Sequence, residues 1–105
     1  MKHNIDIKEL EDRVDLIYSI LGESLDTTDY NDLLLATGKM LADAEFALAT
    51  KKAEALNKIL KEKPTMSANE QKVQVESRCA DVARVARKVE QLNRALGIII
   101  ANKRS

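Results

Sequence analysis

The chain has 105 residues, of which 45% are hydrophobic and 32% charged, with only 3 Gly and 1 Pro. This composition is too apolar for a disordered chain and has too few turn-forming residues for an all-β fold. The formal net charge is zero, yet residues 1–50 carry 4 Lys/Arg against 11 Asp/Glu, whereas residues 51–105 carry 13 against 6. The two halves either attract each other within the fold or present a basic surface to nucleic acid or to an acidic partner.

The first predicted helix spans residues 7–21. Asp6 can cap its amino end, and Glu9 stands three residues later, as a capping box requires. Gly22 is placed to end the helix. The apolar residues of this segment recur at helical spacing, namely Leu10, Val14, Ile17 and Leu21. Its carboxylates Glu11 and Asp15 share the same spacing, and we interpret them as a solvated face.

The second predicted helix spans residues 29–62, with Thr28 as its cap and Lys63-Pro64 as its end. It carries apolar residues on two sides. The first stripe comprises Leu34, Thr37, Leu41, Ala44, Leu48 and Ala55, with Lys51 interrupting it. The second stripe comprises Leu35, Ala42, Phe46, Ala49, Ala53, Leu56 and Leu60.

A helix with two apolar sides is packed on both of them. We expect the third helix to cover the first stripe and the first helix to cover only the near half of the second stripe. The remainder, Phe46, Ala49, Ala53, Leu56 and Leu60, is a predicted oligomer interface unless the chain bends and closes on it.

The third predicted helix spans residues 68–100 and opens on the capping box Ser67 to Glu70. The short link 62–66 predicts that it folds back antiparallel on the second helix. A heptad pattern predicts its buried face: Val75, Cys79, Val82, Ala86, Val89, Asn93, Leu96 and Ile100, widened by Val85, Leu92 and Ile99.

Asn93 is a polar residue in this apolar face. In coiled coils one such Asn fixes the register of the helices, although here it could instead lie near a frayed end. We expect the opposite face of the third helix to lie in solvent: Arg84, Arg87, Lys88, Gln91 and Arg94, together called the basic face. Folding about residue 65 would place Asp43 and Glu45 opposite Arg84 and Arg87.

Catalytic and metal chemistry have little support in this sequence. His3 is the only histidine and lies in a predicted terminal tail, and Cys79 lies in an apolar face without a histidine to activate it. One Cys and one His cannot supply a metal-ligand pattern. We therefore predict no enzyme, no cofactor and no metal.

The sequence also predicts a cytoplasmic location for the protein. A single cysteine fits a reducing cytoplasm, the first ten residues contain no apolar signal segment, and no apolar run approaches the ~20 residues of a membrane span.

Nucleic acid is the alternative partner, because the basic face could follow a phosphate backbone, with Lys51, Lys52, Lys58, Lys61 and Lys63 as a second basic cluster. Exposed aromatic residues for base stacking are missing.

The segments SANEQK (67–72) and EQLNRAL (90–96) resemble the second long helix of small helical proteins encoded in bacteriophage genomes. Such proteins are often encoded among early genes for DNA recombination or among genes that disarm host defences. The resemblance implies a phage or prophage protein acting in the bacterial cytoplasm, and it carries over no functional residue.

These observations predict an all-α, single-domain protein: a long antiparallel, coiled-coil-like helical hairpin with a shorter N-terminal helix, completing a bundle by oligomerisation, most simply as a dimer. The favoured function is that of a non-enzymatic adaptor or inhibitor that binds a protein partner, such as a host defence component. The alternative is an accessory DNA- or RNA-binding protein of phage recombination or replication.

Overall fold

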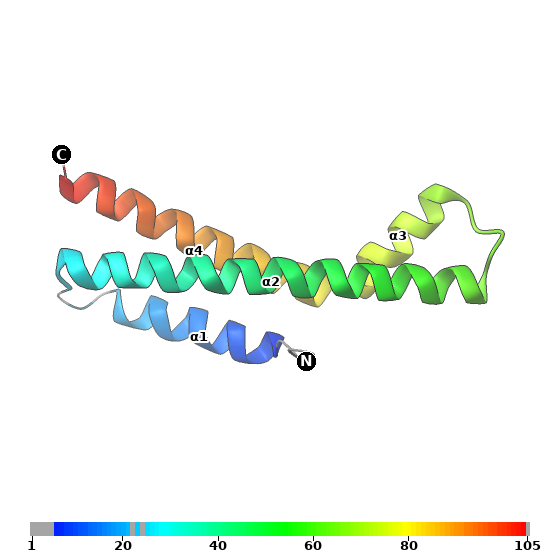
Figure 1. The fold of residues 1–105 in the computed structure, drawn as a ribbon, viewed down its shortest axis with the longest axis horizontal. Coiled ribbons are helices and arrows are strands. Elements are labelled where there is room, and N and C mark those ends of the chain that lie inside the picture. The colour runs from blue at the N-terminus through cyan, green and yellow to red at the C-terminus, as the bar shows by residue number, and fades with distance from the viewer. Residues whose placement is uncertain (1–5, 22, 24, 105) are drawn as a thin grey trace.

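A computed structural model of the protein describes residues 6–21, 23 and 25–104. Within them the chain forms four helices and no strand: α1 (Ile7–Ile20), α2 (Thr27–Glu62), α3 (Ala68–Arg78) and α4 (Ala80–Arg104) (Figure 1). The predicted all-α hairpin is confirmed, since the long helix α2 packs against α4 over much of its length. The predicted roles of His3 and Gly22 lie outside the described residues.

The amino ends of the helices follow from short polar residues in extended backbone. Asp6 accepts hydrogen bonds from the backbone amides of Lys8 and Glu9 at 3.0 and 3.2 Å, and Ser67 accepts one from Glu70 at 3.3 Å. Each cap satisfies amides that the helix itself leaves unpaired. The side chain of Glu9 forms an ion pair with Arg13 one turn further along α1.

Helix α2 begins earlier than the sequence predicted. Asp26, not Thr28, is its cap: the Asp26 carboxylate accepts from the amide of Asp29 at 2.8 Å, and the Asp29 carboxylate accepts from the amide of Asp26 at 3.1 Å. This reciprocal capping box fixes the first turn of a 36-residue helix, which is about 54 Å long at 1.5 Å rise per residue.

The core lies between α2 and α4 and is closed by α1. Helix α4 buries most of its predicted face, with Asn93 and Ile99 only partly buried, while α2 contributes Thr37, Ala44 and Ala55 from the first stripe, together with Met40 and Ile59. The buried α4 residues are Val82, Val85, Ala86, Val89, Leu92, Leu96 and Ile100. At the open end of the hairpin the ammonium of Lys103 lies 5.0 Å from the ring centre of Tyr30, which ties the end of α4 to the start of α2.

The predicted third helix is not continuous. It breaks at Cys79, whose backbone (φ −105°, ψ 7°) leaves the helical region, and whose amide is shared between the carbonyls of Val75 and Glu76. Helix α4 then continues through Gly97 to Arg104. The segment before the break packs mainly on α2, whereas the segment after it packs on both α1 and α2. Because of the bend, α3 and α4 lie at different angles to α2, and α4 alone of the two contacts α1 (Figure 1).

Helix α1 lies alongside the amino-terminal half of α2 (Figure 1). Its buried residues Leu10, Val14 and Ile17 join the core shared by α4 and α2. The molecule is therefore three helices thick at one end and narrower at the hairpin tip, with overall extents of 56 × 30 × 20 Å. No helix among the described residues is long and apolar enough to span a membrane.

Candidate interaction surface

The second stripe is the main apolar surface that α2 leaves uncovered. Leu35 is 74% exposed and Phe46 63%, and Leu56 and Leu60 are also exposed. Between them lie the exposed alanines 42, 49 and 53. At about 100° per residue, the stripe occupies the side of α2 that faces away from its buried residues.

The expectation that the first helix covers the near half of this stripe is wrong. Helix α1 packs instead into the angle between α4 and α2, where its apolar face joins the main core. Leu35, which stands at the near end of the stripe, consequently remains in solvent. The uncovered surface therefore extends from Leu35 to Leu60, further than the predicted interface.

A shallow groove adjoins the stripe where α3 bends away from the end of α2. Its volume is about 420 Å³. Ala53 and Leu56 line it from α2, and Ala68 and Val75 line it from α3, with Lys52, Gln71, Lys72 and Glu76 also contributing. An open groove with apolar walls is suited to an aliphatic side chain from outside.

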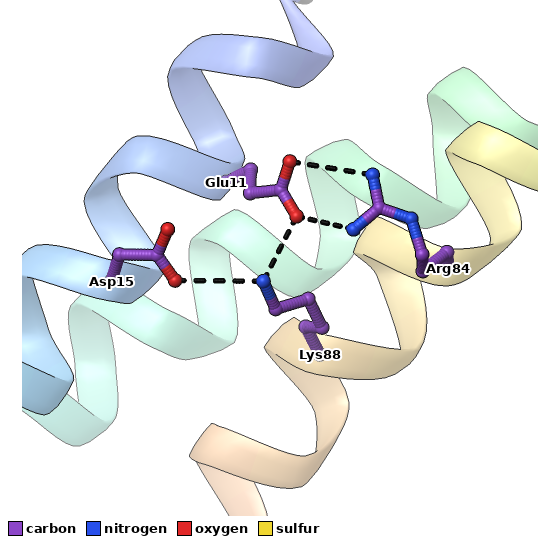
Figure 2. A network of polar contacts seen from close by, with 4 residues as sticks. All are labelled: Glu11, Asp15, Arg84 and Lys88. Carbon is purple, nitrogen blue, oxygen red and sulfur yellow. Dashed lines mark hydrogen bonds and ion pairs between the residues drawn. The ribbon is translucent and has the colours of Figure 1, made fainter.

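The basic face does not lie wholly in solvent, which corrects the prediction. Figure 2 shows that Glu11 of α1 accepts two hydrogen bonds from the guanidinium of Arg84 and one from Lys88, the last at 2.9 Å. The ammonium of Lys88 also lies 3.5 Å from Asp15. The predicted pairing of Arg84 with Asp43 or Glu45 is wrong, since Arg84 pairs with Glu11.

The network perturbs the ionisation of its members. Hydrogen bonds from Arg84 and then from Lys88 lower the pKa of Glu11 from 4.5 to about 2. The same hydrogen bonds to Glu11 raise the pKa of Arg84 and that of Lys88. All three groups are held in their charged forms, and the network fastens α1 to α4.

The rest of the basic face is exposed and partly neutralised. Arg94 forms an ion pair with Glu90 at 2.9 Å on its own helix, while Arg87 and Gln91 are exposed. Arg84 and Arg87 share a groove of about 500 Å³ with Lys52 and Glu76. Because Arg84 and Lys88 already face carboxylates, fewer cations remain for a phosphate backbone than the sequence suggested.

Sequence reasoning missed the role of Glu11 and Asp15, which we had interpreted as a solvated face. A signal was present: the two carboxylates stand four residues apart on one helix, and Arg84 and Lys88 stand four residues apart on another. Charges at that spacing lie on one side of a helix, so the two pairs match each other. The pattern indicates which face of the hairpin α1 occupies.

Asn93 belongs to α4, and its partly buried side chain contacts α2. Its amide nitrogen donates to the hydroxyl of Thr37 at 2.9 Å and to the carbonyl of Leu34 at 3.2 Å. The Thr37 hydroxyl in turn donates to the same carbonyl at 3.1 Å. A Cβ atom at Gly38 would lie 3.8 Å from the Asn93 side-chain nitrogen, an ordinary van der Waals contact, so this position does not require glycine. These contacts join one turn of α2 to one turn of α4.

Cys79 is buried, with 1% of its surface exposed, at the break between α3 and α4. Among the residues described, no cluster of three or more His, Cys, Asp or Glu could hold a metal ion. The main surface features are an apolar stripe with an adjoining groove and a partly neutralised basic face.

Comparisons with known proteins add no relative to this description. No protein-family model, curated protein or solved structure matches the chain. The resemblance to small phage proteins stays a prediction from the sequence.

Proposed function

We propose that this protein is a non-enzymatic helical interaction protein that self-associates through the second stripe of α2 and acts as an adaptor or inhibitor of a protein partner. The observation that carries the proposal is the apolar surface from Leu35 to Leu60, which lies on the side of α2 opposite its own core. An exposed apolar stripe of this kind, interrupted by Lys39, is typical of an interaction site on a small protein.

The energetics support an occupied stripe. Removing apolar surface from water contributes roughly 25 cal/mol per Å². The small residues Ala49 and Ala53 occupy the middle of the stripe, so a facing helix can approach closely there. Leu35 and Leu60 at its ends supply larger apolar contacts.

The test is the oligomeric state of the purified protein, measured by multi-angle light scattering and sedimentation at tens of micromolar. We expect a dimer, because a two-fold axis is the commonest way to cover a self-complementary patch. The double variant Ala53→Glu with Leu56→Glu should be monomeric, since it places carboxylates in the stripe. Ala101→Glu, an exposed alanine on α4, is the chemically matched control and should leave the dimer intact.

Two results would contradict the proposal in different ways. A wild-type protein that runs as a monomer would overturn self-association. A dimer that survives the double substitution would move the interface to another surface. The adaptor or inhibitor role is tested by quantitative affinity purification from the native host, comparing wild type with the double variant. A partner that binds the dimer is depleted with the double variant and retained with Ala101→Glu.

A further inference from the structure

The second stripe has the spacing of one side of a coiled coil. With Lys39 included, its positions are 35, 39, 42, 46, 49, 53, 56 and 60, which alternate in steps of four and three residues without a break. This order of steps is the same when read from either end. Its midpoint falls between Phe46 and Ala49, about 20 Å from each end at 1.5 Å rise per residue.

Charge is distributed unevenly along the same helix. Residues 27–50 of α2 carry 4 Asp/Glu against 1 Lys, whereas residues 51–62 carry 4 Lys against 2 Glu. A second helix of the same sequence complements this distribution only when it runs in the opposite direction. In the parallel direction, acidic half would face acidic half, and Lys39 would face its own copy.

We propose that the occupant of the second stripe is α2 of a second copy of this chain, packed antiparallel, with the two-fold axis passing between Phe46 and Ala49. This inference rests on the proposed self-association and adds its direction and register. The symmetric spacing of the stripe and the opposite charges of the two halves of α2 carry it.

In this register small residues lie at or opposite the centre of the stripe, and leucines meet at its ends. Phe46 faces Ala49 of the second copy, and Ala42 faces Ala53 of the second copy, so the two helices approach closely at the centre. Leu35, 74% exposed in the single chain, meets Leu60 of the second copy beside the groove between α2 and α3. The stem of Lys39 covers Leu56 of the second copy while its ammonium reaches water.

The same register also places Glu45 of one copy close to Lys52 of the other copy, near the two-fold axis. Glu45 and Lys52 are the residues that flank the stripe on one side, and in an antiparallel pair Glu45 of each copy lies across from Lys52 of the other. Both side chains are exposed, and no ion pair joins either one to another residue within the part of the chain that the structure describes. Two such pairs form per dimer.

Charge reversal tests the register directly. Glu45→Lys alone sets lysine against lysine at both pairs, and Lys52→Glu alone sets glutamate against glutamate. Each single variant should weaken self-association by roughly tenfold at low salt, measured as the dimer Kd by sedimentation. Mixing the two single variants should produce a heterodimer, because every pair is then lysine against glutamate. The double variant should restore the homodimer.

Control variants distinguish the antiparallel register from self-association through the second stripe. Lys58→Glu, an exposed lysine outside the stripe, should not change the dimer Kd, and circular dichroism checks that every variant keeps its helices. The antiparallel register is overturned if the dimer depends on the stripe but neither single variant raises the dimer Kd. It is also overturned if mixing the two single variants does not restore dimer formation. Either result leaves self-association itself intact. A monomeric wild type overturns both.

Discussion

At the scale of single residues, the side chains of Asn93 on α4 and Thr37 on α2 form a hydrogen bond that joins the two helices. Thr37 is fully buried, so its hydroxyl depends on partners within the protein. The remaining contacts between α2 and α4 are mainly aliphatic. Aliphatic contacts allow one helix to shift along the other more easily than a directional hydrogen bond does.

We predict that Asn93→Ala and Thr37→Val each destabilise the protein by about 1 kcal/mol, the net contribution of a hydrogen bond. Combined, the two changes should cost less than the sum of the single effects, since both remove the same contact. Chemical denaturation of the four proteins in a double-mutant cycle measures this coupling. Additive effects would mean that the hydrogen bond contributes nothing to stability.

Glu11 makes the junction of α1 and α4 sensitive to acid. Its pKa is lowered from 4.5 to about 2 in the folded protein, chiefly by hydrogen bonds from Arg84. A carboxylate whose pKa falls on folding stabilises the protein above its unfolded pKa, and this contribution is lost as the pH falls through the folded pKa. The window of loss here lies between about pH 4.5 and about pH 2.

We therefore predict that Glu11→Gln is less stable than wild type at pH 7 and that the difference narrows as the pH falls from 4.5 towards 2. Urea denaturation at several pH values measures it. Because the network is partly exposed, high salt should also narrow the difference at pH 7. Asp12→Asn, on an exposed side of the same helix, serves as the control and should match wild-type stability at pH 7. A pH-independent difference would show that Glu11 acts through packing alone.

At the scale of elements, α3 is the least supported helix. It contains no buried residue, and Val73 on its surface is 62% exposed. The ion pair between Arg78 and Glu62, at 3.7 Å, joins two solvent-accessible side chains and contributes little. Helix α4, in contrast, buries seven hydrophobic side chains between α1 and α2.

We predict that amide hydrogens of residues 72–78 exchange at least roughly tenfold faster than those of residues 85–96, because local opening of α3 exposes little apolar surface. Hydrogen exchange followed by mass spectrometry or NMR compares the two segments within one sample. Equal protection would indicate that α3 and α4 open only together, as one cooperative unit across Cys79.

The elements differ in how well the sequence predicts them. Ser67 and Asp6 act as caps where short polar residues precede an apolar period, so these helix starts were predictable. The break at Cys79 was not predictable, because no Gly or Pro marks it and the heptad pattern runs through it. The prediction of Thr28 as the cap of α2 is wrong, because the reciprocal hydrogen bonds between Asp26 and Asp29 start the helix earlier.

At the scale of the whole molecule, the packing of α4 followed from its heptad pattern, whereas the position of α1 did not. The apolar face of α1 is chemically similar to any aliphatic surface, so Leu10, Val14 and Ile17 could cover either stripe of α2. The salt-bridge network of Glu11 and Asp15 selects the α4 side. A consequence is that the candidate interface is larger than the sequence indicated, because Leu35 joins it.

The pairing of α1 with α4 also determines when the chain can fold during its synthesis. Glu11 and Arg84 are 73 residues apart, and the apolar face of α1 has no complete surface to cover until α4 exists. At ~5–20 residues per second, a ribosome needs about 4–15 s to make that intervening stretch. During this interval Leu10, Val14 and Ile17 are available to chaperones and proteases. The nascent chain therefore reaches its native core only after the last helix has emerged.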